Sequence, residues 1–249
     1  MIDRDRFLSN LEQVRLRIVR AAERSGRDPT TVRIVAAAKT VPPEPIRWAV
    51  EAGVTAIGQN YVPDLRRVRP LVPGARWHYI GTLQSGHAPQ VAELADVVES
   101  VAGERAARRL GRRAAREGRT LDALIEIDFT SERSGVDPDE AARFADLVAS
   151  LDGLRLIGLM TIAPLGRDAE ASRPVFVRLR QLTARIRERH PEVLETSMGM
   201  SLDYEVAAEE GATMVRIGTA LFGPRPTPAD APEPTMQPGT QPREQEERR

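Results

Sequence analysis

Cysteine is absent from this 249-residue chain, which excludes disulfides, thiolate nucleophiles, iron-sulfur clusters and cysteine-based zinc sites. The three histidines, His78, His87 and His190, lack the spacing of metal ligands. Acidic and basic residues balance at 36 each, so no net charge draws the chain to nucleic acid or to an anionic membrane. We therefore expect a small-molecule partner, with no metal, nucleic acid or membrane involved.

Long apolar runs are also missing. The N-terminal sequence MIDRDRFLSN carries acidic residues and lacks the apolar centre of a secretory signal. No window approaches the roughly 18 uninterrupted apolar residues of a membrane span. These absences predict a cytoplasmic protein.

Lysine is nearly absent, because Lys39 is the single lysine among the 36 basic residues. Chance in an arginine-rich composition is one explanation. A chemical explanation is that arginine replaces lysine as a surface cation but cannot form an imine, since its guanidinium stays protonated and delocalised. Lys39 is therefore a candidate for amine chemistry.

The apolar pattern predicts a chain in which strands and helices alternate. An amphipathic helix over 3–25 places Phe7, Leu11, Val14, Ile18 and Ala21 on one face. The clearest later helices cover 43–52, 103–117, 137–149 and 169–189. Strands are predicted at 33–38, 54–58, 77–80, 95–99, 122–128, 154–160, 193–197 and 213–217.

Eight such repeats favour a single (β/α)8 barrel, a TIM barrel with an additional N-terminal helix, over 1–223. A doubly wound open sheet is the alternative fold. Residues 224–249 are rich in proline and polar residues and cannot bury enough apolar surface to offset ordering entropy. We expect them to form a disordered tail.

Lys39 follows the apolar run at 34–38, which places it at the carboxyl end of the first strand, the functional face of a barrel. Small neighbouring residues reduce its hydration, which favours a neutral amine that can attack an aldehyde. These neighbours also leave space for a ring.

Two small-residue turns late in the chain are candidates for a phosphate site. Ser197 to Ser201 and Gly218 to Ala220 follow the seventh and eighth predicted strands, where barrels often bind phosphate through backbone N–H groups. Ordinary helix capping is the alternative for each turn. Arg216 lies between apolar strand residues, so it contacts either a ligand or a structural carboxylate.

Two further features suggest only structural roles. His78 in the third strand is interpreted as a hydrogen-bonded core residue. The arginines at 105–119 recur at helical spacing with alanines and acids, which indicates a solvated helix face and not a nucleic-acid patch.

Six motifs in order carry a resemblance to a known family across about residues 7 to 223. The chain resembles the pyridoxal phosphate homeostasis protein family, whose members share the barrel of alanine racemase. The motifs are Val35-Ala36-Ala37-Ala38-Lys39-Thr40, Gly58-Gln59-Asn60-Tyr61, His78-Tyr79-Ile80-Gly81-Thr82-Leu83-Gln84, Gly158-Leu159-Met160, Ser197-Met198-Gly199-Met200-Ser201 and Met214-Val215-Arg216-Ile217-Gly218-Thr219.

The resemblance implies that pyridoxal 5'-phosphate (PLP) is the cofactor, held as an imine on Lys39. It implies that Arg216 faces the pyridine nitrogen and that Asn60 lies near the ring. The remaining implied cofactor-binding residues are Met160, Ser197, Gly199, Ser201, Gly218 and Thr219.

Three positions depart from the family pattern. Gln59 replaces a glutamate, Gly86-His87 replaces Asn-Lys, and Arg133 replaces a lysine. Second lysines proposed as temporary cofactor acceptors are therefore missing, and a delivery route that needs them is not expected here.

Three functions are weighed. The first is a non-catalytic, monomeric PLP carrier that supplies apo-enzymes. The second is a PLP-dependent amino-acid racemase, which in alanine racemase needs a tyrosine from an additional β-domain; Tyr61, Tyr79 and Tyr204 are expected to serve packing or hydrogen bonding instead. The third, a barrel that has lost its cofactor, would make Lys39 a coincidence. The carrier is the favoured hypothesis.

Overall fold

Eight parallel strands pair in chain order and close into a barrel in the computed structural model, which describes residues 2–130, 134–164 and 166–224. The first strand closes the ring by pairing with both the second and the eighth. The barrel prediction is confirmed, and the open sheet is excluded. The strands are β1 (Arg33–Ala37), β2 (Ala56–Gln59), β3 (Arg76–Tyr79), β4 (Val97–Val101), β5 (Leu121–Ile127), β6 (Leu154–Thr161), β7 (Glu195–Met200) and β8 (Met214–Ile217).

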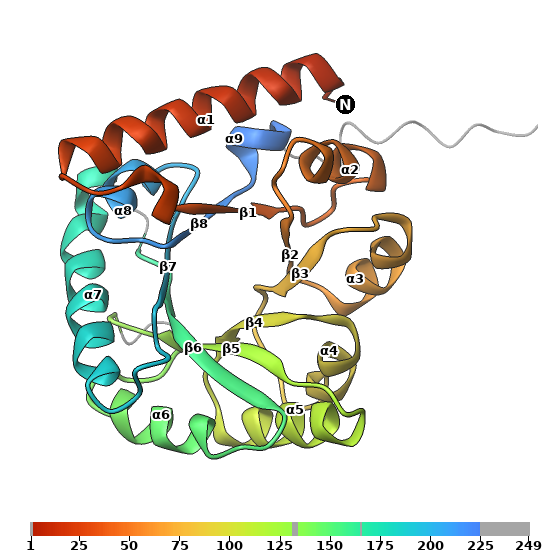
Figure 1. Cartoon of the computed structure of the whole chain (residues 1–249), viewed down its shortest axis with the longest axis vertical. Coiled ribbons are helices and arrows are strands. Elements are labelled where there is room, and N and C mark those ends of the chain that lie inside the picture. The colour runs from red at the N-terminus through yellow and green to blue at the C-terminus, as the bar shows by residue number, and fades with distance from the viewer. Residues whose placement is uncertain (1, 131–133, 165, 225–249) are drawn as a thin grey trace, which may run out of the picture.

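Helices surround the ring of strands (Figure 1). The predicted long helices are present, although 137–140 form a turn and 169–172 a 3-10 helix before their α-helices begin. Four short helices were not singled out by the apolar pattern, and in α3 and α4 a proline occupies the first turn. The α-helices are α1 (Arg4–Arg24), α2 (Pro43–Glu51), α3 (Val62–Val68), α4 (Ala88–Leu94), α5 (Glu104–Arg116), α6 (Ala141–Ala149), α7 (Arg173–Arg187), α8 (Tyr204–Glu209) and α9 (Thr219–Phe222). The 3-10 helices are η1 (Pro29–Thr31), η2 (Arg69–Leu71) and η3 (Ala169–Ser172).

The seventh strand is longer than predicted. It continues to Met200, so Ser197 and Gly199 lie within the strand and not in a turn after it. The pairing of β7 with β8 is irregular between Ser197 and Met200, and Gly199 has a φ of 86°. The small residues therefore mark a bulge inside the strand, and that bulge resembles a turn in the sequence.

Helix α1 buries the predicted apolar stripe and supports the last helix of the barrel. Asp3 caps α1 by accepting a hydrogen bond from the backbone N–H of Arg6 at 2.8 Å. The ring of Phe7 stacks on Phe222 with centroids 5.5 Å apart. The Asn10 amide donates to the carbonyl of Leu221 at 3.0 Å. These contacts position α9 and the turn before it.

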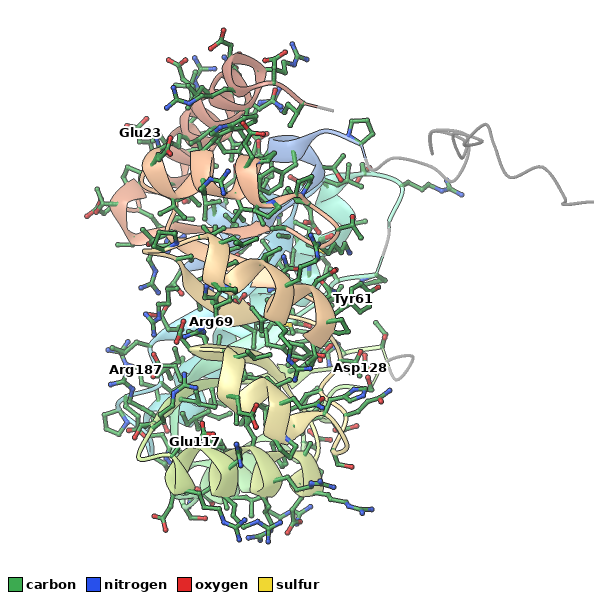
Figure 2. The ribbon with its side chains drawn as sticks, turned by 90° about the vertical axis from the view of Figure 1, so that its right-hand side faces the viewer. Glu23, Tyr61, Arg69, Glu117, Asp128 and Arg187 are labelled. Carbon is green, nitrogen blue, oxygen red and sulfur yellow. The ribbon has the colours of Figure 1, made fainter. Side chains whose placement is uncertain are left out.

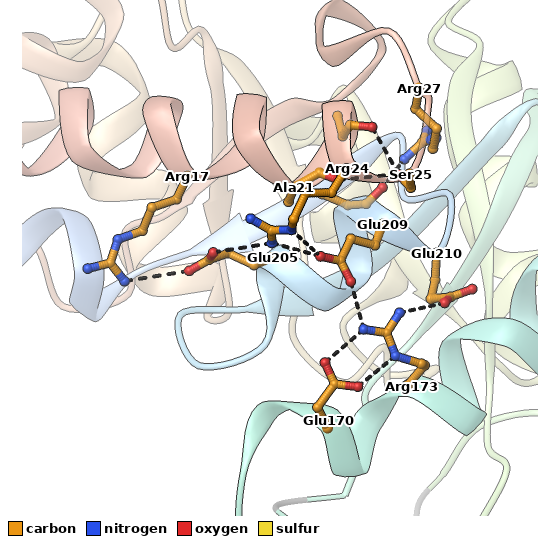
Figure 3. A network of polar contacts seen from close by, with 12 residues as sticks. Arg17, Ala21, Arg24, Ser25, Arg27, Glu170, Arg173, Glu205, Glu209 and Glu210 are labelled. Atoms are coloured by element: carbon orange, nitrogen blue, oxygen red, sulfur yellow. Dashed lines mark hydrogen bonds and ion pairs between the residues drawn. The ribbon is translucent and has the colours of Figure 1, made fainter.

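Ion pairs join α1, α7 and α8 on the outside of the barrel (Figure 3). Glu209 accepts from Arg24 at 2.7 Å and from Arg173 at 2.6 Å. Arg173 also contacts Glu170 and Glu210, and these hydrogen bonds raise the pKa of its guanidinium. The network is structural and lies outside the barrel interior.

The arginines of α5 form a solvated helix face, as predicted. The helix buries alanines and Leu110, while Arg108 pairs with Glu104 at 2.8 Å on the exposed side. No helix in the described ranges combines the length and apolar character that a membrane crossing requires.

Side chains inside the barrel form a small apolar cluster separate from the main core. Residues two apart on a strand point to the same side, so alternate residues of each strand face inward. The larger core fills the space between strands and helices. The inner cluster comprises Val35, Val97, Leu124, Met160 and Met214.

The two ends of the barrel differ in what they carry. Tyr61 and Asp128, which follow β2 and β5, lie on one side of the view in Figure 2. Glu23, Arg69 and Arg187, which precede strands, lie toward the opposite side. The side of Tyr61 and Asp128 is the carboxyl end of the strands, where barrels build their sites.

Candidate functional site

Lys39 lies two residues beyond β1, in the turn that follows the strand. Its side chain is half-buried and lines a cavity of about 950 Å³ together with Gly218, Thr219 and Ala220. The volume is within the range of small-molecule sites. The single lysine of the chain therefore lines a cavity that also contains the residues directly after β8.

The backbone around Lys39 is held tightly. Thr40 has a φ of 64°, a left-handed conformation that non-glycine residues adopt rarely, and its hydroxyl donates to the carbonyl of Lys39 at 2.6 Å. Ala38 donates its N–H to the carbonyl of Gly58 at 2.8 Å. These constraints fix where the lysine side chain leaves the backbone.

Gln59 supports the same segment from β2. It is fully buried, and its amide nitrogen donates to the carbonyl of Ala38 at 2.9 Å. An ionised glutamate could not donate this hydrogen bond. The departure at this position therefore has a local consequence: the amide ties β2 to the residue before Lys39.

The turn after β8 and the segment after β7 converge at Ser201. The backbone N–H groups of Gly218 and Ala220 both point to the Ser201 hydroxyl oxygen, each at 3.3 Å. The Thr219 side chain is exposed beside them in the cavity. Two backbone donors and the Thr219 hydroxyl thus belong to residues that line the cavity with Lys39, a donor set suited to an anion.

Arg216 lies in β8, and its buried side chain reaches β6 and β7 inside the barrel. It is 5% exposed, and its two terminal nitrogens donate to the Ser197 hydroxyl at 2.6 Å and to the Thr161 carbonyl at 2.8 Å. The Ser197 hydroxyl in turn donates to Glu99 at 2.6 Å. The guanidinium therefore has a structural carboxylate close by, 3.8 Å from Glu99.

Glu99 also accepts a hydrogen bond from His78 Nδ1, at 2.6 Å. Because an ionised carboxylate only accepts, Nδ1 must carry the proton. The interpretation of His78 as a hydrogen-bonded core residue is confirmed. Glu99 itself escaped notice in the sequence, where the only signal is an acid inside the apolar run Val97-Val98-Glu99.

Opposing effects act on the two buried charges. Burial alone would raise the pKa of Glu99, but the hydrogen bond from His78 and the charge of Arg216 hold it below its ordinary value. Burial lowers the pKa of Arg216, and the carboxylate charges of Glu99, Glu126 and Asp203 oppose this effect. Both groups are therefore charged at neutral pH.

The predicted site residues lie at different depths in the barrel. Asn60 is half-buried just after β2, and its Oδ1 is buried without a hydrogen-bond partner among the described residues. Met160 and Ser197 lie deeper, in the inner cluster and in the Arg216 network. Gly199 packs toward α8, because a Cβ there would lie 2.4 Å from that of Ala207.

The tyrosines and the positions that depart from the family pattern lie in different parts of the structure. Tyr79 and Tyr204 are buried, as packing roles predict, and Tyr61 is 55% exposed at the carboxyl end of β2. Burial raises the pKa of both buried phenols. His87 is exposed before α4, whereas Arg133 and the expected tail beyond Pro224 lie outside the described residues. The described ranges hold no cluster of three or more potential metal ligands.

A closed (β/α)8 barrel with a lysine after its first strand and backbone N–H donors in the turn after its last is the architecture that the alanine racemase barrel has. The family model for the alanine racemase N-terminal domain matches residues 2–226. The chain belongs to the pyridoxal phosphate homeostasis protein family, which is built on this domain.

Two relatives carry the name of that family. The pyridoxal phosphate homeostasis protein of Escherichia coli K12 is 40% identical over 227 residues, covering 87% of this chain and 95% of the relative. That of Aquifex aeolicus is 37% identical over 220 residues, covering 86% of this chain and 96% of the relative.

Solved structures of other proteins share the fold of this chain. A protein of unknown function from Bifidobacterium adolescentis is 34% identical with a TM-score of 0.80, covering 89% of this chain and 98% of that one. PipY of Synechococcus elongatus, solved with PLP bound, is 32% identical with a TM-score of 0.74, covering 83% and 100%. Alanine racemase of Clostridium difficile, 15% identical with a TM-score of 0.72 and covering 91% and 58%, shares the fold.

Substitution of Gly81 by alanine is expected to destabilise the site. A Cβ at Gly81 would lie 2.1 Å from the backbone oxygen of Asn60, so the segment after β2 must move. We expect the free energy of unfolding in urea to fall by about 1 to 3 kcal/mol. The control is Gly86→Ala, where nothing lies within 4 Å, and its effect should stay within about 0.5 kcal/mol. Equal stability of the two variants would contradict a tight approach at Asn60.

Proposed function

We propose that this protein binds PLP covalently on Lys39 and acts as a non-catalytic, monomeric carrier that supplies the cofactor to apo-enzymes in the cytoplasm. The observation that carries the proposal is the position of the single lysine beside the donors of Ser201, Gly218 and Ala220. An amine and a set of backbone donors that line one cavity match the aldehyde and the phosphate of this cofactor. The names of the relatives and the PLP-bound PipY structure support it.

The donor set fits each part of the cofactor. The Lys39 amine condenses with the aldehyde and releases one water molecule, which leaves a Schiff base. The backbone N–H groups of Gly218 and Ala220, now directed at the Ser201 hydroxyl, are available to a phosphate that takes its place. The unpartnered Oδ1 of Asn60 and the exposed Thr219 hydroxyl are further polar groups for the ligand.

Arg216 accounts for a carrier in preference to an enzyme. A guanidinium cannot accept a proton. If Arg216 faces the ring nitrogen, it therefore donates a hydrogen bond to that nitrogen and disfavours protonation of the ring. An unprotonated ring is a weaker electron sink, which makes removal of an α-proton from a bound amino acid harder. Two of the three tyrosines that could supply a second acid-base group are buried, Tyr79 and Tyr204.

The purified protein should be yellow, because Lys39 supplies the only side-chain amine. Borohydride reduction followed by peptide mapping should place the pyridoxyl group on Lys39. The control Lys39→Arg keeps the positive charge but cannot form an imine, so its visible band should vanish. A wild-type protein that stays colourless after incubation with PLP would end this proposal.

Ser201→Leu should weaken the binding of PLP far more than that of pyridoxal, since only PLP carries the anion. Losing a hydrogen bond to a charged group typically costs about 1.5 to 3 kcal/mol, or roughly 10- to 100-fold in affinity. Titration of the visible band measures both affinities. The exposed Ser150→Leu, at the end of α6, should change neither. If Ser201→Leu weakens both ligands equally, the phosphate binds elsewhere.

Amino-acid turnover should be negligible. The loaded protein is incubated with L- or D-alanine in deuterated water, and α-proton exchange and chirality are followed by NMR. General acid-base catalysis commonly contributes about 10²- to 10⁴-fold, and the poor electron sink removes more. Multiple turnovers that Lys39→Ala abolishes would instead identify a racemase.

A further inference from the structure

Glu99 is a buried carboxylate that the proposed binding of the aldehyde and phosphate does not use. It lies in the middle of β4 and is fully buried. His78 from β3 and Ser197 from β7 each donate a hydrogen bond to it at 2.6 Å. Burying such a charge is costly, so hydrogen-bond donors and a positive charge inside the barrel must offset it.

The hydrogen bonds run in one direction, toward Glu99. Arg216 donates to the Ser197 hydroxyl at 2.6 Å, and that hydroxyl has only one proton, which it donates to Glu99. A serine that is tied to the carboxylate in this way must present its lone pairs to the guanidinium. Glu99 therefore orients Arg216 through Ser197, although the two charges lie 3.8 Å apart.

A second anchor completes the placement of the guanidinium. Its other terminal nitrogen donates to the Thr161 carbonyl on β6 at 2.8 Å. With both terminal nitrogens bonded, the planar group cannot rotate freely. A rigid donor binds a ligand at a lower entropic cost than a mobile one.

We propose that Glu99 is a positioning residue for the cofactor ring: by fixing Ser197 it holds the charged Arg216 guanidinium where the ring nitrogen binds. This inference rests on the proposed function, because it assumes PLP as the ligand. The carboxylate acts through Arg216 and does not touch the cofactor. Its contribution should therefore appear only with ligands that have a ring nitrogen.

The experiment compares PLP with its 1-deaza analogue, in which carbon replaces the ring nitrogen. Both carry the same aldehyde and phosphate, so a general change in the electrostatics or folding of the site affects them alike. We expect Glu99→Gln to raise the dissociation constant of PLP about 10-fold and that of the deaza analogue less than about 2-fold. Titration of the visible band of the full-length protein gives each value.

Two further variants provide an alternative disruption of the network and a control. Ser197→Ala leaves both charges in place but cuts the link between them, so it should show the same selective loss and serves if Glu99→Gln fails to fold. Glu195→Gln is the matched control, because it removes a carboxylate at the first residue of β7 that bonds to Thr213 and Arg33. It should bind both ligands as the wild type does.

The outcomes separate this inference from the proposed function. A wild-type protein that binds neither ligand would overturn the carrier proposal. A wild-type protein that binds PLP normally, while Glu99→Gln and Ser197→Ala weaken both ligands equally or neither, would overturn the role of Glu99 alone. Selective loss of PLP in both variants would support it.

Discussion

A positive charge buried inside the barrel is the constraint on which the rest of the site depends. Arg216 cannot lose its proton at neutral pH, so the interior must supply an acceptor for it. The Ser197 hydroxyl and the Thr161 carbonyl accept hydrogen bonds from it, and the Glu99 carboxylate lies 3.8 Å away on a third strand. These bonds require β4, β6, β7 and β8 to keep one relative register, because a shift of one residue would turn the side chains to the opposite face. The network thus couples the position of Arg216 to the register of these four strands.

The functional end of the barrel follows from closure of the sheet. Parallel strands bring all their carboxyl ends to one side, so residues 39 and 218, far apart in sequence, line one cavity. Helix α1 supports this end of the barrel from outside. Phe7 packs on α9, and the Asn10 amide donates a hydrogen bond to α9, which begins directly after Gly218. The Lys39 amine and the backbone donors of Gly218 and Ala220 therefore lie directly beside strands and a helix of the barrel.

Much of this architecture can be predicted from the sequence, because apolar periodicity directly reports burial. All eight strands, the stripe of α1 and the place of Lys39 at a strand end follow from it. The extent of β7 does not, since its bulge uses Ser197 and Gly199, residues typical of turns. Helices of four to seven residues, such as α9, are too short to show a period.

The polar interior is harder to predict, for a physical reason. Glu99, Gln59 and Ser197 gain their roles from partners on other strands, and pairing across a barrel leaves no local signal. A charged residue in an apolar run shows only that a partner exists. Its identity requires the register of the closed sheet.

A crystal structure of the protein with PLP tests the central claim most directly. We expect continuous electron density from Lys39 Nζ to the aldehyde carbon, with the phosphate against Gly218, Ala220 and Ser201. The Arg216 guanidinium should lie within hydrogen-bond distance of the ring nitrogen. A cofactor that is not bonded to Lys39, or whose ring nitrogen lies away from Arg216, would contradict it.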